Sequence, residues 1–169
     1  MSRIALPPYR RIVTGHDAAG RAVIHSDAQF RPEPIPGGDA AFSLVWATPK
    51  VPVDNDDPVD GRDRNPGLTL HGGSVIRVVD MLPGGESPMH RTNSLDFGIV
   101  LAGEVELELD DGVKTTVGPG SIVVQRGTIH LWRNPSTSVP CRIVFVLVEA
   151  SPVTVNGVPL AELKPEQAG

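Results

Sequence analysis

Residues 83–103, PGGESPMHRTNSLDFGIVLAG, decide the fold of this 169-residue chain. A Pro-Gly-Gly turn leads to His90, Asp96 follows six residues later, and a glycine ends the apolar run. A second stretch at residues 120–134, GSIVVQRGTIHLWRN, repeats this order with a glycine turn, an apolar run, a second turn and His130. Each stretch delivers an imidazole from a turn beside a predicted strand. The two histidines and Asp96 therefore form one candidate site.

Short β-prone runs separated by turns surround these two stretches. Residues 105–109 alternate apolar and acidic side chains, which is typical of a strand with one face in water, and an Asp-Asp-Gly turn follows at 110–112. Residues 122–124 and 143–148 are apolar without alternation, which predicts strands covered on both faces. The candidate strands of this region are residues 74–82, 95–101, 105–109, 121–125 and 142–148. So many short strands with hardly any helical periodicity indicate an all-β sandwich or barrel.

The first part of the chain predicts an extension to this barrel. Residues 11–16 and 21–26 are β-prone runs that form a hairpin, since Gly20 can supply the positive φ of the connecting turn. Three prolines disfavour regular structure at residues 30–38, and residues 41–48 are a further strand.

Residues 49–67 are polar, acidic and broken by prolines. We expect a solvated loop there, with a lid over a pocket as the alternative. The chain is then one domain in three parts. Residues 1–70 hold an arm, the hairpin and the acidic loop, and pack on the barrel or on a dimer partner. Residues 71–150 form the barrel, and residues 151–169 form a C-terminal segment and a polar tail.

Composition limits the classes of function. The formal net charge is −5, the pI is near 5.5, and no lysine or arginine run exists, so we expect no nucleic-acid partner. Cys141 is the single cysteine and is interpreted as a small buried hydrophobe, which fits a reducing compartment. The N-terminus does not resemble a signal peptide, and no run reaches the roughly 18 apolar residues of a membrane helix. We expect a cytoplasmic protein that does not bind membranes.

The two histidine stretches resemble the paired motifs of the cupin superfamily. In the first family motif a glycine precedes a His-x-His pair, a glutamate and a second glycine, and the corresponding residues here are Gly84, His90-Arg91-Thr92, Asp96 and Gly103. In the second, a glycine precedes a Pro-x-Gly turn, a histidine and an asparagine, and the corresponding residues are Gly120, Gln125-Arg126-Gly127, His130 and Asn134. The turn comes one residue early. The resemblance covers residues 74–148 and implies a single-domain, cupin-type jelly-roll β-barrel.

In metal-binding cupins, two histidines and the glutamate of the first motif and the histidine of the second are the metal ligands. Carried over by position, this implies a metal site of His90, Asp96 and His130 for iron, manganese, zinc or nickel. Thr92 stands where the second histidine belongs, and aspartate is one methylene shorter than glutamate. The alternatives are therefore a two-His, one-carboxylate metal centre and a site without a cofactor.

Several other residues are candidates for the site or for structural roles. Asp96 in an apolar strand must be paired, hydrogen-bonded or metal-bound, and an ion pair with Arg77, Arg91 or Arg126 is the structural alternative. Arg77 interrupts an apolar run, and an inward arginine there suits an acidic or carbonyl substrate. Trp132 shares the face of His130, and is either core or substrate contact. The expected substrate-binding residues are Arg77, Thr92, Gln125 and Trp132.

The remaining polar motif residue and the histidines outside the motifs are expected to have structural roles. Asn134 is expected to cap a turn. The three histidines outside the motifs are ordinary surface residues: His16, His25 and His71.

Three functions remain open. The first is a metal-dependent enzyme of small-molecule metabolism, with dioxygenase, decarboxylase, lyase or isomerase chemistry on a carbonyl, acidic or aromatic compound. The second is a metal-free enzyme in which Asp96 orients His90 or His130 as a general base. The third is a non-catalytic module that binds a small ligand. In each case we expect a homodimer with the N-terminal region in its interface, because exposed sheet edges need covering.

Overall fold

The computed structural model describes residues 5–67 and 71–164. The first four residues of the predicted arm and the last five of the predicted tail lie outside the described residues, as do residues 68–70. The strands are β1 (Tyr9–His16), β2 (Ala22–Phe30), β3 (Glu33–Pro34), β4 (Ala40–Thr48), β5 (Ser74–Met81), β6 (Ser94–Ala102), β7 (Val105–Glu108), β8 (Lys114–Val117), β9 (Ile122–Arg126), β10 (Leu131–Arg133), β11 (Cys141–Glu149), β12 (Thr154–Val155) and β13 (Val158–Pro159). Two 3-10 turns, η1 (Gly61–Asp63) and η2 (Asp110–Gly112), complete the elements.

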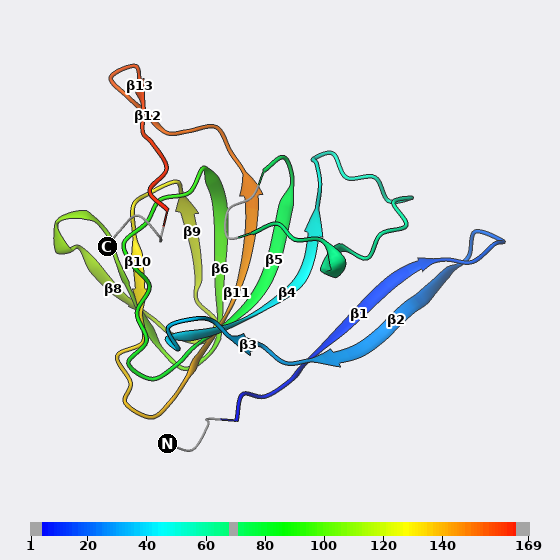
Figure 1. The fold of residues 1–169 in the computed structure, drawn as a ribbon, viewed down its shortest axis with the longest axis horizontal. Coiled ribbons are helices and arrows are strands. Elements are labelled where there is room, and N and C mark those ends of the chain that lie inside the picture. Colours follow the sequence, from blue (N-terminus) through cyan, green and yellow to red (C-terminus); the bar gives the residue numbers. More distant parts are fainter. Residues whose placement is uncertain (1–4, 68–70, 165–169) are drawn as a thin grey trace.

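Two antiparallel sheets form the body (Figure 1). The larger has the strand order β3-β4-β5-β11-β6-β9, and the smaller has the order β10-β7-β8. Their facing sides share one core, in which Val79, Val100 and Ile143 of the larger sheet meet Val105 and Trp132 of the smaller one. This is the predicted all-β jelly-roll barrel. β4 pairs with β5, so the chain before residue 71 contributes a strand to the main sheet.

The register of the larger sheet assigns side chains to an inner and an outer face, because residues opposite each other point the same way. Arg77, Phe145 and Gly98 form one inner row across β5, β11 and β6, and Leu147, Asp96 and Gln125 form another across β11, β6 and β9. Phe97, Val124 and Val146 form an outer row, and Ile99, Ile122 and Val144 form the next.

The expectation that residues 122–124 and 143–148 are covered on both faces is wrong. Ile122 is 65% exposed and Val124 is 54% exposed, and Val144 and Val146 are only half-buried. The reason is that β9 is the edge strand of the larger sheet and nothing in the described chain covers its outer face.

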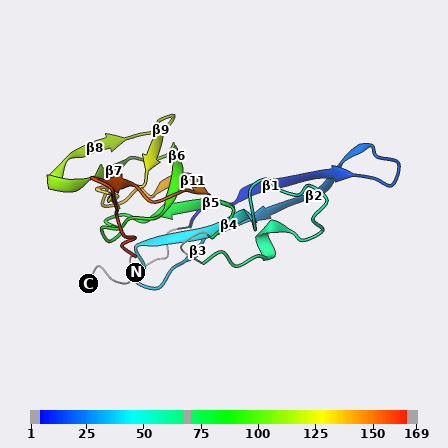
Figure 2. The same cartoon turned by 90° about the horizontal axis from the view of Figure 1, so that it is seen from above.

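The predicted N-terminal hairpin is confirmed, with strands longer than expected and Gly20 at φ +75° in the turn. β1 and β2 pair only with each other and project from the body (Figures 1 and 2). The base of the hairpin is anchored by Arg11, which is buried, pairs with Asp60 and lies 5.2 Å from the Phe30 ring centroid and 5.7 Å from that of Trp46.

The acidic loop at residues 49–67 is exposed over most of its length, as predicted for a solvated loop. Its end is not free, because η1 follows Asp60 and packs on β4: a methyl group on Gly61 would collide with the Trp46 ring. No residue of this loop lines the cavity described below, and its role as a lid stays a prediction. A bilayer-spanning helix is absent from residues 5–67 and 71–164, where each helical turn has three residues.

Candidate functional site

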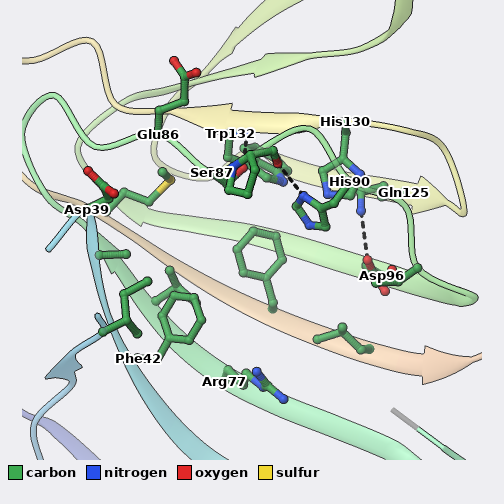
Figure 3. A pocket seen from close by; sticks show the side chains of 18 of the residues that line it. Asp39, Phe42, Arg77, Glu86, Ser87, His90, Asp96, Gln125, His130 and Trp132 are labelled. Carbon is green, nitrogen blue, oxygen red and sulfur yellow. Dashed lines mark hydrogen bonds between the residues drawn. The ribbon is translucent and has the colours of Figure 1, made fainter. Parts of the chain in front are cut away.

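A cavity of about 380 Å³ opens between the two sheets (Figure 3). Its apolar wall comes mainly from the inner face of the larger sheet, with Trp132 from the smaller sheet. The larger apolar side chains of the lining are Ile35, Phe42, Val79, Met81, Trp132, Phe145 and Leu147. Seven of the cavity's polar residues are Arg77, Glu86, His90, Thr92, Asp96, Gln125 and His130. All predicted catalytic and substrate-binding residues therefore line this one cavity. Lining it does not by itself assign their roles.

His90 and His130 are held side by side by their own backbones. Each residue donates its N–H to the carbonyl of the other at 2.9 Å, which forms an isolated antiparallel bridge between the two motif loops. The ring centroids are 4.2 Å apart and the rings are tilted by 55°. Two segments 40 residues apart in sequence thus deliver their imidazoles to one point of the cavity (Figure 3).

Backbone carbonyls orient both imidazoles. Nδ1 of His90 lies 2.8 Å from the Pro88 carbonyl oxygen, and Nδ1 of His130 lies 2.9 Å from that of Thr128. Since a carbonyl only accepts, each Nδ1 carries the proton, and each Nε2 keeps a lone pair. The hypothesis that Asp96 orients a histidine is wrong, because the carbonyls of Pro88 and Thr128 do so.

Burial keeps both imidazoles neutral at pH 7. His130 is 2% exposed, and this burial, helped by the proximity of His90, lowers the pKa of His130 to about 3. Burial also lowers the pKa of His90, while the hydrogen bond to Pro88 opposes the shift. The site therefore offers two unprotonated nitrogen bases.

Asp96 is paired with an amide. Nε2 of Gln125 donates to Oδ2 of Asp96 at 2.9 Å across β9 and β6. The expected ion pair with Arg77, Arg91 or Arg126 is wrong, because Asp96 pairs with no described arginine and bonds Gln125 instead. Burial raises the pKa of Asp96, while hydrogen bonds from Ser94 and Gln125 oppose the shift. Oδ1 of Asp96 is buried without a hydrogen-bond partner in the described chain.

Aromatic packing shapes the cavity between the histidines and Arg77. Trp132 and Phe145 meet edge to face, with ring centroids 5.5 Å apart at 71°. Gly98 makes room for this pair, since a Cβ there would lie 3.0 Å from Cε1 of Phe145. The ring of Phe145 fills this space. Thr92, at the position of the missing histidine, hydrogen-bonds Ser94 at 2.8 Å.

Two expectations outside the cavity chemistry are confirmed. The side-chain oxygen of Asn134 accepts from the Ser136 N–H at 3.0 Å, and its amide donates to the carbonyls of Met81 and Val139, so Asn134 caps a turn and ties it to β5. Outside the motifs, His16, His25 and His71 are exposed.

Sequence reasoning missed the aromatic wall. Phe42 and Phe145 line the cavity, but the run 143–148 was interpreted as covered on both faces instead of as a strand with an inner and an outer side. Alternation counted from Ile143 would have placed Phe145 and Leu147 on the same face as that core residue. Alternation along β4 does not identify the side that Phe42 faces, because a bulge between Leu44 and Trp46 shifts the pairing of β4 with β5.

The Nδ1–H bonds of both histidines to carbonyls are a feature that metal-bound histidines share, since these donate their second ring N–H to a carbonyl or carboxylate. The third predicted ligand does not join them: Asp96 is held by Gln125. In the described residues no three His, Cys, Asp or Glu side chains are grouped closely enough to hold an ion. The residues thus present two nitrogen ligands for a metal instead of the three ligands that the motif resemblance implied.

Comparison with known proteins agrees with the fold. The model of the cupin domain family matches residues 77–147. A phomopsin biosynthesis cluster protein (C') of Diaporthe leptostromiformis is 44% identical over 154 residues, which cover 87% of this chain and 82% of that protein. The cupin-domain-containing oxidoreductase fogC of Aspergillus ruber is 39% identical over 87% of this chain and 75% of its own.

Among solved structures, the cupin domain of Schizosaccharomyces pombe Cnp3 superposes with a TM-score of 0.52 at 11% identity, over 83% of this chain and 89% of that one. The chain therefore belongs to the cupin superfamily.

Proposed function

We propose that this protein is an enzyme that converts an apolar small molecule bearing a carbonyl or hydroxyl group, with His90 and His130 as the groups that move its proton. One observation carries the proposal: two neutral imidazoles present free Nε2 lone pairs at the polar end of an otherwise apolar cavity. Neutral bases in a dry pocket suit general base catalysis. The relatives support an enzyme of biosynthetic small-molecule metabolism, since one is named an oxidoreductase and another a biosynthesis cluster protein.

The reaction that these residues serve best is the formation of an enol. Nε2 of His90 or His130 takes a proton from the carbon beside a carbonyl, and the electron pair of that C–H bond becomes the new C=C bond. Burial raises the pKa of Asp96, and in its protonated form Asp96 can donate that proton to the carbonyl oxygen. Delivery of the imidazolium proton to another carbon or to the opposite face, with return of the enol O–H proton to Asp96, completes an isomerisation, and an oxidation would need an electron acceptor in addition. The apolar wall of Phe145, Trp132 and Leu147 keeps water from competing for these protons.

The test is conversion of a panel of aryl ketones and aldehydes in D2O, with deuterium uptake and product mass as readouts. We expect the wild-type chain to exchange or convert at least one member, and His90→Gln and His130→Gln to lose roughly 100-fold or more of that rate. Val124→Ala, on the outer face, is the matched control and should retain full activity. Unchanged turnover in the folded double histidine variant contradicts the proposal.

A metal-dependent oxidoreductase is the second candidate, favoured by the carbonyl-oriented imidazoles and by the names of the relatives. His90 and His130 would hold the ion through Nε2, and an ion of iron, manganese, zinc or nickel would supply Lewis acidity or reactivity with dioxygen. In this version the aromatic wall still excludes water and Asp96 and Gln125 would hydrogen-bond the substrate, while His90 and His130 would hold the ion instead of transferring protons.

Elemental analysis and thermal shift distinguish the two versions. For the metal enzyme we expect near one equivalent of transition metal in protein purified without additions, and a rise of the unfolding temperature with added metal that disappears in His90→Gln. If the protein contains no bound metal and added metal causes no thermal shift, the metal-free version remains.

A further inference from the structure

Arg77 lies in the cavity wall without an acidic partner. It occupies β5 between Val75 and Val79, both of which are buried, and its row on the inner face continues with Phe145 and Gly98. The side chain is half-buried, lines the cavity, and is labelled below the aromatic wall in Figure 3. A guanidinium in that position has an apolar environment on most sides.

Two other arginines of low exposure are neutralised by carboxylates, whereas Arg62 and Arg91, which form no ion pair with a described residue, lie outside the cavity lining. Arg11 pairs with Asp60, and Arg142 pairs with Asp80 at 2.6 Å. Arg77 forms no ion pair with any described residue; one Nη donates to the Gly67 carbonyl, and its Nε–H is buried without an acceptor in the described chain. Its pKa is lowered by burial, whereas pairing with carboxylates raises those of Arg11 and Arg142. A desolvated cation with an unused donor favours an anion.

The carboxylates around the cavity do not satisfy this charge. Glu86 is paired with Arg133, Asp96 is bonded to Gln125, and Asp39, the third lining carboxylate, forms no ion pair with Arg77. Asp96 lies two strands from Arg77 and two residues along, which places the two Cα atoms about 12 Å apart. The space between them is bordered by Phe145 and Leu147, the inner residues of the intervening strand.

We propose that Arg77 anchors the carboxylate of the substrate, so that the natural ligand is an apolar, aromatic acid whose acidic group lies at β5 and whose reacting carbon lies beneath His90 and His130. This inference rests on the proposed function and specifies its substrate class. A carboxylate accepts two parallel N–H bonds from a guanidinium, which fixes the orientation of the ligand as well as its position. The aromatic body then packs against Phe145 and Trp132.

The test uses two probes of equal shape, naphthalene-2-carboxylate and its neutral analogue naphthalene-2-carboxamide, with binding measured by calorimetry. Loss of one charge-assisted bond corresponds to roughly 10- to 100-fold in affinity, so we expect the wild-type chain to prefer the acid by that factor. Arg77→Met should remove the preference and leave the amide's affinity unchanged, while Arg77→Lys should keep part of it. Arg126→Met is the matched control, because Arg126 is exposed on β9 and lies outside the cavity.

Three outcomes overturn the anchor: equal affinity of the wild type for both probes, a preference for the acid that survives in folded Arg77→Met, and binding of neither probe by the folded wild type. Because binding is measured without turnover, failure here is distinct from failure of the proposed function. Equal binding of both probes removes the anchor and leaves the catalytic histidines standing. If Arg77→Met loses the acid preference while the histidine variants turn over normally, the anchor stands and the catalytic role of the histidines fails.

Discussion

The two faces of the larger sheet reverse the usual distribution of polarity. On the inner face of β6 and β9, Asp96 and Gln125 are buried at 5% and 6% exposure. On the outer face of the same strands, Ile122 and Val124 are more than half exposed. A buried carboxylate and an exposed isoleucine are each unfavourable in an isolated barrel. This difference motivates two proposals, a ligand bound at the inner face and a protein contact on the outer face.

The largest expected effect is the difference in unfolding free energy lost when a side chain is truncated on the inner face or on the outer face. Ile143 is fully buried on the inner side, so Ile143→Ala should lower the free energy of unfolding by about 2–5 kcal/mol. Ile122→Ala removes the same atoms from an exposed position and should change it by less than about 0.5 kcal/mol. Urea unfolding, at dilutions where the chain is a monomer, measures both. Equal losses would mean that the two faces do not differ.

The outer face should associate. We propose that its rows of Phe97, Ile99, Ile122, Val124 and neighbouring β11 residues pack against a second copy of the chain, on a surface other than the N-terminal region that the sequence suggested for the dimer interface. Light scattering should then give twice the 17.9 kDa of one chain. Val124→Lys should weaken association by on the order of 2 kcal/mol, whereas Val124→Ile should preserve it. A wild-type mass of one chain would contradict the proposal.

The inner face should make stability depend on pH. The pKa of His130 is depressed to about 3 in the folded chain. Between about pH 6.5 and pH 3, His130 is therefore protonated in the unfolded chain but not in the folded one. Stability should therefore fall as the pH drops from about 6.5 toward 3, by up to about 1.4 kcal/mol per pH unit for this residue. His130→Gln should flatten this part of the profile. A profile that His130→Gln leaves unchanged would show that the imidazole does not stay neutral.

The smallest effect concerns Asp96. Its raised pKa means that the folded state resists ionisation, so the charge destabilises the protein once the pH passes above the unfolded value of about 4. Asp96→Asn keeps the size of the side chain and should stabilise the protein at pH 7 but not below pH 4. Thermal unfolding at the two pH values measures this. Destabilisation at pH 7 would mean that Asp96 is ionised and favourably placed.

Local rules predicted most of the fold. Gly20 and the Asp-Asp-Gly turn marked their hairpins, and the motif spacing identified the barrel and gathered His90 and His130. These features depend on neighbours in sequence, and turn chemistry and strand alternation report such neighbours directly. The pairing of Asp96 with Gln125 instead of an arginine was not predictable. Gln125 and Arg126 are neighbours on one strand, and the sequence does not show which of them faces Asp96 in the paired sheet.

The sequence by itself determined the strands, the turns and the two histidine loops, because glycine conformations and side-chain alternation are local properties. Only the tertiary structure decided the tautomers of His90 and His130, the partner of Asp96 and the isolation of Arg77. Those depend on which strands become neighbours, and the register of the larger sheet, set across segments far apart in the chain, fixes which side chains share the cavity. The segment around His90 therefore specifies a cupin barrel, and the partners brought to it by folding specify its chemistry.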